Sequence, residues 1–248
     1  METPLLTLSG VTFSYFTETE QTQAVAGLDM EVKRGEFCAI VGPSGCGKTS
    51  VLSLMMGLLK PQAGTIAFSE PNLRIGYMLQ RDHLLEWRMV EKNVLLGLEV
   101  QRRLTPEAKT KALQLLDTYG LGAFRRYYPP QLSGGMRQKV ALIRTLALEP
   151  DLLLLDEPFS ALDYQTRLQL SDEVYRIIRE QNKTAVLVTH DISEAVSMAD
   201  RVFVFSRRPS RIKTILETGF DRALSPLMRR HTPAFLDLYD RAWKEIDR

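Results

Sequence analysis

Hydrophobic and polar residues alternate along the start of the chain and then change period. Residues 5–15 and 28–32 alternate, and glycine and the polar stretch 17–23 interrupt them, so they predict antiparallel strands joined by loops. Residues 37–41 are continuously apolar, which is typical of a strand buried on both faces of a parallel sheet. Residues 48–59 carry apolar side chains at spacings of three and four, which predicts a helix directly after that strand.

The remaining chain mixes short apolar runs with helical spacing. Strands are predicted at residues 64–68, 75–79, 152–155, 185–189, 202–205 and 212–216. Helices are predicted between residues 88 and 119, with Thr105 as an N-cap and Gly120 as a stop, and over 135–148, 164–181 and 232–246. Pro129 and Pro130 are expected to exclude helix before Gly134. The alternation of strands and helices predicts an α/β fold.

A glycine-rich segment follows the first fully apolar strand. Gly42 to Thr49 spell GPSGCGKT, which matches the phosphate-loop pattern G-x-x-x-x-G-K-[ST] between a strand and a helix. Glycines let successive backbone N–H groups face one concavity, Lys48 would reach the β- and γ-phosphates, and the Thr49 hydroxyl would ligate Mg²⁺. We therefore predict ATP and Mg²⁺ as ligands. The predicted nucleotide-binding residues are Gly42, Pro43, Ser44, Gly45, Cys46, Gly47, Lys48, Thr49 and Ser50.

Two carboxylates end the apolar run 152–155. Asp156 and Glu157 would lie at the carboxyl end of a buried strand, where parallel sheets place ligand-binding residues. Asp156 would hold Mg²⁺, directly or through a water, and Glu157 would orient and deprotonate the attacking water. Taken alone, the same acidic pair is also compatible with a strand end that solvates a turn.

The segment Leu132-Ser-Gly-Gly-Met-Arg-Gln138 resembles the signature motif of ATP-binding cassette (ABC) proteins. The resemblance implies a P-loop NTPase with a RecA-like, mostly parallel sheet core, an antiparallel β subdomain and an inserted α-helical subdomain. It also implies that the signature residues Ser133, Gly134, Gly135 and Gln138 act on ATP held by a second copy of the chain. A homodimer that sandwiches nucleotide is therefore expected.

Other positions match the same family one at a time. The resemblance implies that Gln80 contacts Mg²⁺ and the attacking water, that Asp163 belongs to a loop acting across the dimer, and that His190 contacts the γ-phosphate. Tyr15 matches the aromatic residue that stacks on adenine, and Phe16 remains an alternative. The metal set implied is Thr49, Gln80 and Asp156, and the catalytic set is Glu157, His190 and Gln80.

The resemblance also predicts how the chain is divided. Residues 1–80 and 150–215 are expected to form the nucleotide-binding core with the β subdomain. Residues 81–149 are expected to form the helical signalling subdomain that carries the signature and accepts a coupling helix from a membrane subunit. Residues 216–248 would be a C-terminal helical extension.

Local segments resemble the importers of the nitrate, sulfonate and taurine group. These segments are Leu84-Leu85 with Trp87, Asn93-Val94, and the run from Arg208 to Ile212, although Glu86 replaces a proline common in that group. The resemblance implies transmembrane permease subunits and an extracytoplasmic solute-binding protein as partners, at the cytoplasmic face of the membrane. An exporter-type ABC ATPase and a cassette ATPase acting on nucleic acid or ribosomes are the alternatives.

Composition restricts these alternatives. The chain has 32 basic and 30 acidic residues and a net charge of +2, so no large positive excess is available for nucleic acid, which is not expected as a partner. No apolar stretch approaches the roughly 20 residues that cross a bilayer. Cys38 and Cys46 are expected to remain unpaired thiols.

Overall fold

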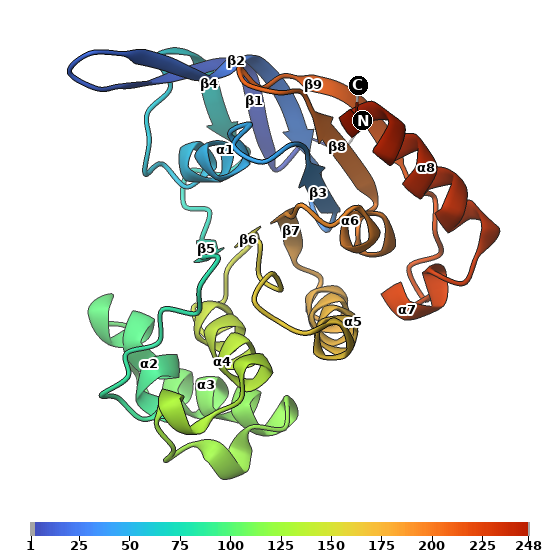
Figure 1. Cartoon of the computed structure of the whole chain (residues 1–248). Coiled ribbons are helices and arrows are strands. Elements are labelled where there is room, and N and C mark those ends of the chain that lie inside the picture. Colours follow the sequence, from blue (N-terminus) through green and yellow to red (C-terminus); the bar gives the residue numbers. More distant parts are fainter. Residues whose placement is uncertain (1–2, 248) are drawn as a thin grey trace. The chain divides into compact units, whose positions relative to one another are not determined.

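The computed structural model describes residues 3–247 and divides the chain into two compact units (Figure 1). Unit 1 contains the described residues up to Leu73 and from Ser171 onward, and unit 2 contains Arg74–Leu170. The second boundary falls within helix α5, Tyr164–Glu180. Within the described residues, no helix combines the length and the apolar character needed to cross a membrane.

Unit 1 contains an antiparallel sheet of three strands in the order β2-β1-β4. They are β1 (Leu6–Phe16), β2 (Gln21–Val32) and β4 (Ala63–Phe68). The structure corrects the predicted start of the second strand from residue 28 to Gln21. Thr17 and Glu20 close a tight turn through a backbone N–H···O bond of 2.9 Å, so the polar residues that follow pair with the end of β1. Backbone pairing in an exposed hairpin requires no apolar side chains, and hydrophobic patterning therefore missed it.

Unit 1 also contains a group of mostly parallel strands. The central strand β3 (Phe37–Val41) pairs in parallel with β7 (Thr184–Val188) and with β8 (Arg201–Phe205), and β8 pairs antiparallel with β9 (Ile212–Glu217). Every residue of β3 and β7 is buried. The continuous apolar runs therefore form strands covered on both faces, as predicted.

Helices cover the strands of unit 1. Helix α6 (Ile192–Met198) packs against β3, and α8 (Pro233–Asp247) packs against α6, β8 and β9 (Figure 1). The short helix α7 (Pro226–Arg229) precedes α8 and contacts α6. Helix α1 (Lys48–Met55) is shorter than the predicted span 48–59. Gly57, at φ +79°, takes the left-handed conformation that commonly ends a helix.

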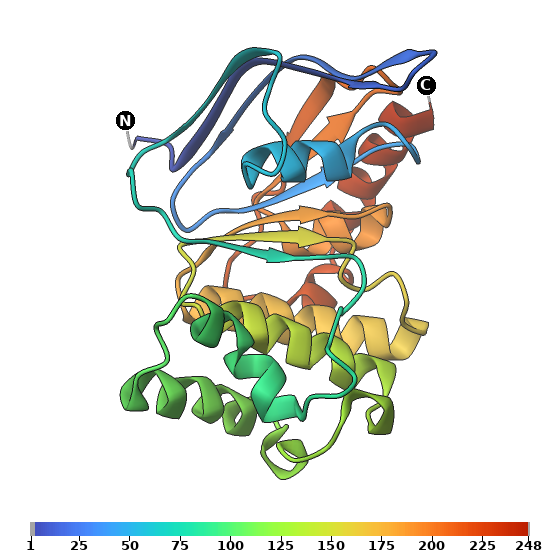
Figure 2. The same cartoon turned by 90° about the vertical axis from the view of Figure 1, so that its left-hand side faces the viewer.

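Unit 2 joins two parallel strands to a helical group. Strands β5 (Ile75–Met78) and β6 (Leu152–Asp156) run side by side, and α4 (Gly134–Leu146) contacts β5 (Figure 2). Helices α2 (Val90–Val100) and α3 (Pro106–Thr118) pack against α4 and against each other. Parallel strands in both units, an antiparallel sheet and interspersed helices confirm the predicted α/β class.

The ends of the helices in unit 2 test the prediction from capping residues. Thr105 caps α3 by accepting a 3.2 Å hydrogen bond from the N–H of Ala108, and Gly120 follows the helix at φ +75°, as predicted. The structure corrects the prediction that no helix precedes Gly134, because Pro129–Gln131 form a 3₁₀ turn, η2. The first position of a helical turn needs no N–H donor, so proline is tolerated there. A second 3₁₀ turn, η1, spans Gly122–Phe124.

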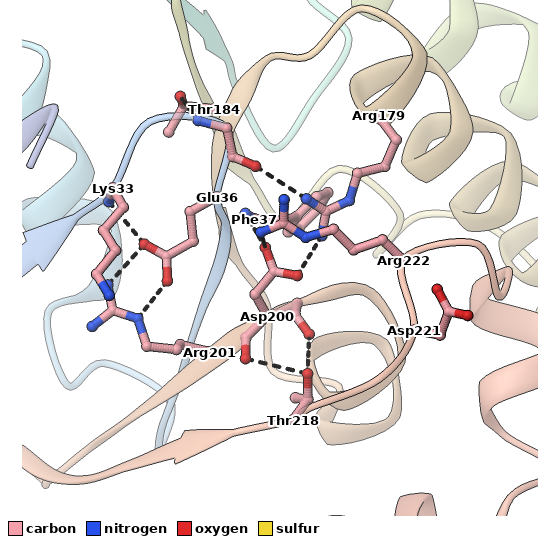
Figure 3. A network of polar contacts seen from close by, with 12 residues as sticks. Lys33, Glu36, Phe37, Arg179, Thr184, Asp200, Arg201, Thr218, Asp221 and Arg222 are labelled. Atoms are coloured by element: carbon pink, nitrogen blue, oxygen red, sulfur yellow. Dashed lines mark hydrogen bonds and ion pairs between the residues drawn. The ribbon is translucent and has the colours of Figure 1, made fainter. Parts of the chain in front are cut away.

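A network of charged side chains ties the start of β3 to α5 and β8 (Figure 3). The Asp200 carboxylate accepts hydrogen bonds from the Phe37 N–H at 2.9 Å and from Arg179 Nη2 at 2.6 Å. Glu36 accepts hydrogen bonds from the Arg201 guanidinium, one of them at 2.8 Å, and these bonds raise the pKa of Arg201. The network therefore fixes the strand that leads into the glycine-rich loop.

Replacing Asp200 tests this role. We expect Asp200→Ala to lower the free energy of unfolding by about 2–4 kcal/mol, because it leaves Arg179 and the Phe37 N–H without their acceptor. The matched control is Arg222→Gln. Arg222 contacts the same carboxylate at 3.2 Å, but its side chain is 62% exposed, so we expect a loss below about 1 kcal/mol. Urea unfolding followed by circular dichroism measures both, and equal losses would contradict the assigned role.

Candidate functional site

The glycine-rich loop of unit 1 lies between the buried strand β3 and helix α1. Gly45 and Gly47 have φ values of +72° and +114°, in the region that glycine favours. A Cβ atom on Gly42 would lie 3.0 Å from Phe205, and one on Gly47 would lie 3.0 Å from the carbonyl oxygen of Ala24. Backbone angles and close packing therefore both account for the glycines of this loop.

Lys48 is buried within the loop that precedes it. Its Nζ donates to the carbonyl oxygens of Gly42 at 2.8 Å and Pro43 at 3.1 Å, and the residue is only 7% exposed. An ammonium group carries three donors, and these bonds use two of them. The side chain is therefore held at the centre of the loop, where a phosphate would need a cation.

Three aromatic residues of β1 differ in their surroundings. The Tyr15 hydroxyl lies 3.0 Å from Ser50 Oγ on α1, and its ring contacts Phe13 edge to face at 4.9 Å. Phe13 is buried, while Phe16 is 66% exposed. Tyr15 is thus the aromatic residue with a direct contact to the helix that follows the loop, and Phe16 extends into the hairpin beyond it.

Both cysteines are unpaired thiols, as predicted. Cys46 lies in the loop and is 1% exposed. Burial raises the pKa of its thiol, and the neighbouring charges of Lys48 and Arg208 partly oppose that rise. A neutral, packed thiol at this position is part of the loop's core and is poorly suited to act as a nucleophile.

His190 follows strand β7 at the same edge as the loop. Ile40 pairs with Val188 in the parallel register, and the Thr189 N–H donates to the Ile40 carbonyl oxygen at 3.2 Å. Beyond His190, Asp191 caps α6 by accepting a 2.8 Å bond from the N–H of Ser193. The backbone is therefore fixed on both sides of an exposed histidine.

Unit 2 brings three predicted residues together. Met78 pairs with Leu155, so the parallel strands β5 and β6 end side by side. Directly beyond those ends, Gln80 Nε2 donates to Glu157 Oε2 at 3.0 Å. Asp156 is 3% exposed and accepts a hydrogen bond of 3.3 Å from the Tyr77 hydroxyl.

The backbone of Glu157 is strained. Its φ is +44°, which is uncommon for a residue with a side chain. Its carbonyl oxygen accepts bonds from the N–H of Ser160 at 3.2 Å and from Ser160 Oγ at 3.0 Å. These bonds stabilise the conformation that presents the Glu157 carboxylate to Gln80.

The signature segment begins helix α4. Ser133 is the N-cap, and its hydroxyl accepts a 3.3 Å bond from the N–H of Met136. A Cβ atom on Gly135 would lie 2.8 Å from Thr166 Cγ2, whereas one on Gly134 would meet only Leu162 at an ordinary 3.5 Å. Helix α4 therefore begins at two exposed residues, Ser133 and Gly134, whereas Gly135 is packed against Thr166.

The start of α5 packs beside this segment. Asp163 accepts a 3.1 Å bond from the N–H of Thr166, and the hydrogen bonds from Thr166 hold the pKa of Asp163 below its usual range. Gln138 is 4% exposed, and its Oε1 has no hydrogen-bond partner among the described residues. Asp163 is therefore an exposed anion, whereas Gln138 is largely enclosed.

The segment from Leu84 to Trp87, which resembles the importer group, has buried and exposed parts. Leu84 is 6% exposed and belongs to the local core, which Asn93 braces through bonds to the backbone of Leu85 at 2.8 and 3.1 Å. Trp87 is 75% exposed and Leu79 is 42% exposed. The exposed apolar side chains in this part of unit 2 are therefore Trp87 and Leu79, whereas Leu84 is buried.

Sequence reasoning missed one contact to the glycine-rich loop. Arg208, in the turn between β8 and β9, donates from Nε and Nη2 to the Gly45 carbonyl oxygen at 3.0 and 2.6 Å. Arg207 and Arg208 line a surface hollow together with Pro43, Ser44 and Gly45. The basic run at 207–211 was visible in the sequence. No local pattern connects it to a loop about 160 residues earlier.

Comparison with known proteins adds independent information. Residues 25–160 match the family model described as "ABC transporter". An uncharacterized ABC transporter ATP-binding protein of Bacillus subtilis is 48% identical over 243 residues, which are 96% of this chain and 94% of the relative. The taurine import ATP-binding protein of Yersinia pestis is 38% identical over 221 residues, which are 87% of this chain and 85% of the relative.

Solved structures share the fold. A dimeric ATP-binding cassette in a post-hydrolysis state, bound to ADP and Pi, superimposes with a TM-score of 0.74 at 30% sequence identity. The match covers 86% of this chain and 98% of that one.

The close packing at Gly135 yields a test. We expect Gly135→Ala to lower the free energy of unfolding by about 1–3 kcal/mol, because the new methyl group would clash with Thr166 Cγ2. Gly134→Ala is the matched control and should cost less than about 0.5 kcal/mol, since alanine favours helix. Adding Thr166→Ser, which removes Cγ2 and keeps the hydroxyl, should restore most of the loss. Urea unfolding of the wild type and the three variants checks this, and a failed rescue would refute the clash.

Proposed function

The chain belongs to the ABC transporter family of ATP-binding proteins, as its motifs predicted, and we propose that it hydrolyses Mg²⁺-bound ATP to energise an importer. The observation that carries the proposal is the 3.0 Å bond between Gln80 and Glu157, at the carboxyl ends of two parallel strands. This pair can hold and deprotonate a water molecule, which is the chemistry that ATP hydrolysis requires of the protein.

Nucleotide binding is assigned to the glycine-rich loop of unit 1. Backbone N–H groups and Lys48 would hold the phosphates, and the helix α1 dipole would favour their negative charge. Tyr15 would stack on the adenine ring, and its bond to Ser50 would orient the aromatic ring relative to the loop.

The three side chains implied as metal ligands carry oxygen donors of the kind that suits a magnesium ion. Thr49 in unit 1 offers a hydroxyl oxygen, and Asp156 and Gln80 in unit 2 offer a carboxylate and an amide oxygen, which are hard ligands of the kind Mg²⁺ prefers. Gln80 uses its nitrogen for Glu157, so its oxygen is the atom left to act as a ligand. When bound, the ion would neutralise charge on the β- and γ-phosphates.

Hydrolysis is assigned to three side chains. Glu157 would accept a proton from the attacking water. Gln80 would orient the water molecule and the Glu157 carboxylate. His190 would donate a hydrogen bond to a γ-phosphate oxygen as negative charge shifts during bond cleavage. The strained backbone of Glu157 supports this role, because such strain persists where the surrounding structure holds a functional side chain in place.

A second copy of the chain is the expected partner at the nucleotide. The positive end of α4, with Ser133, Gly134 and Gly135, would contact the γ-phosphate of ATP bound to the other copy. Asp163, which is exposed, would contribute to that dimer contact. Gln138, which is largely enclosed, would support the signature residues that make it. The dimeric state of the related cassette bound to ADP and Pi favours this assignment.

The transporter that this chain would energise is assigned as an importer of a small anion. The relative named for taurine import, together with the likeness of local segments to the nitrate, sulfonate and taurine group, supports this direction and substrate class. Permease subunits would dock at Trp87 and Leu79, and an extracytoplasmic solute-binding protein would deliver the substrate. The chain would then act at the cytoplasmic face of the membrane.

Glu157→Gln tests the hydrolytic assignment. The amide cannot accept the proton from water, so we expect turnover to fall at least 100-fold while ATP affinity stays within about threefold. Lys48→Ala should instead lose ATP binding. Glu217→Gln, an exposed position on β9, is the control and should behave as wild type. Phosphate release and nucleotide binding measured on the full chain separate these cases. Wild-type turnover in Glu157→Gln would exclude its role as base.

Reconstitution tests the transport assignment. In vesicles that contain this chain with its permease, we expect taurine, an aliphatic sulfonate or nitrate, together with the binding protein, to raise ATPase activity several-fold and to be taken up. Glu157→Gln should abolish uptake. If ATP hydrolysis instead moved the substrate away from the membrane side that carries this chain, the transporter would be an exporter.

A further inference from the structure

The turn between β8 and β9 packs against the glycine-rich loop. Ser210 in this turn is completely buried, and its N–H donates to the carbonyl oxygen of Ala24 in β2 at 2.9 Å. The N–H of Ala26 donates back to the Ser210 carbonyl oxygen at 3.2 Å. A Cβ atom on Gly47 would lie only 3.3 Å from Ser210 Oγ. Strand β2 thus fixes the turn directly beside the loop.

The turn is also braced internally. Ser206 Oγ accepts a 3.0 Å bond from the N–H of Arg211, and its hydroxyl donates to the carbonyl oxygen of Arg207 at 2.9 Å, with that of Pro209 at 3.3 Å. The Ser206 N–H donates to the Arg211 carbonyl oxygen at 2.9 Å. Because the turn is already held in this way, little further conformational entropy is lost when the Arg208 guanidinium contacts the glycine-rich loop.

Arg208 uses that placement to hold a single carbonyl oxygen. Both Nε and Nη2 donate to the Gly45 carbonyl oxygen, at 3.0 and 2.6 Å. Because the peptide unit is planar and trans, fixing this oxygen also fixes the N–H of Cys46 on the opposite side. That N–H donates to the Pro43 carbonyl oxygen within the loop at 3.2 Å.

The Gly45–Cys46 peptide is the part of the loop that most needs such a restraint. Gly45 has no side chain and lies at φ +72°, so rotation of the peptide about it meets little steric resistance. Rotation would turn a carbonyl oxygen toward the side where phosphates bind and would repel them. A charged hydrogen bond from outside the loop opposes that rotation.

We propose that Arg208 is a positioning residue for nucleotide binding, which holds the Gly45 carbonyl oxygen and so keeps it from turning toward phosphate. The inference rests on the proposed binding of ATP by this loop. Arg208 itself need not touch the nucleotide. Its effect passes through the Gly45–Cys46 peptide.

Position and charge can be separated within the same turn. Arg211 carries the same charge, and among the described residues its side chain makes no hydrogen bond to the loop. If Arg208 acted only by attracting phosphate through space, removing either charge would weaken ATP binding to a similar degree and in a salt-dependent way. A positioning role predicts a large effect at Arg208 alone.

The experiment compares Arg208→Gln, Arg208→Lys and Arg211→Gln in the full chain. We measure the Kd for a fluorescent ATP analogue, and kcat and KM for ATP. Arg208→Gln should raise Kd and KM at least about tenfold and change kcat less than about threefold, because the loop conformation is already needed in the bound ground state. Arg208→Lys keeps the positive charge and can donate one hydrogen bond to the Gly45 carbonyl oxygen in place of two, so it should fall between wild type and Arg208→Gln. Arg211→Gln should stay within about twofold of wild type.

The outcomes that overturn the inference are distinct. An unchanged Kd in Arg208→Gln, or an equal rise in Arg211→Gln, would exclude positioning by Arg208 while leaving ATP binding intact. A wild-type chain that binds no ATP would instead refute the proposed function. Thermal unfolding checks that each variant is folded, and if Arg208→Gln does not fold, Arg208→Lys is compared with Arg211→Gln in its place.

Discussion

The glycine-rich loop must engage its carbonyl oxygens in hydrogen bonds if phosphate is to meet N–H groups rather than oxygens. Lys48 takes the oxygens of Gly42 and Pro43, and Arg208 takes that of Gly45. An unpaired carbonyl turned inward would repel phosphate, so the direction of each peptide matters more than the glycine count. The buried lysine and the distant β8–β9 turn both serve this one constraint.

Parallel strand pairing places the chemically important side chains. Within unit 1, the register of β3 and β7 brings the start of the loop and His190 to one edge. Within unit 2, the register of β5 and β6 brings Gln80 beside Glu157. Carboxyl ends of parallel strands meet at a common edge, so residues far apart in sequence converge without any direct sequence signal between them. The partly buried ion network at Asp200 anchors the beginning of β3 and so supports this geometry at its other end.

Much of the fold followed from patterning, and its errors have physical causes. The continuous apolar runs of β3 and β7 and the capped helix α3 were predicted correctly, because burial on both faces and capping are local properties. The polar start of β2 was missed because an exposed hairpin needs only backbone pairing. Helix α1 was predicted too long because Gly57 interrupts a sequence whose apolar spacing continues.

The sequence by itself determined the family, the α/β class and the identity of the phosphate loop and signature, because each depends on residue types at fixed local spacing. Only the tertiary structure decided that Gln80 meets Glu157, that Tyr15 rather than Phe16 contacts α1, and that Arg208 holds Gly45. Those contacts join residues 35 to 163 positions apart, and their distances depend on strand register and turn placement, which no local pattern encodes.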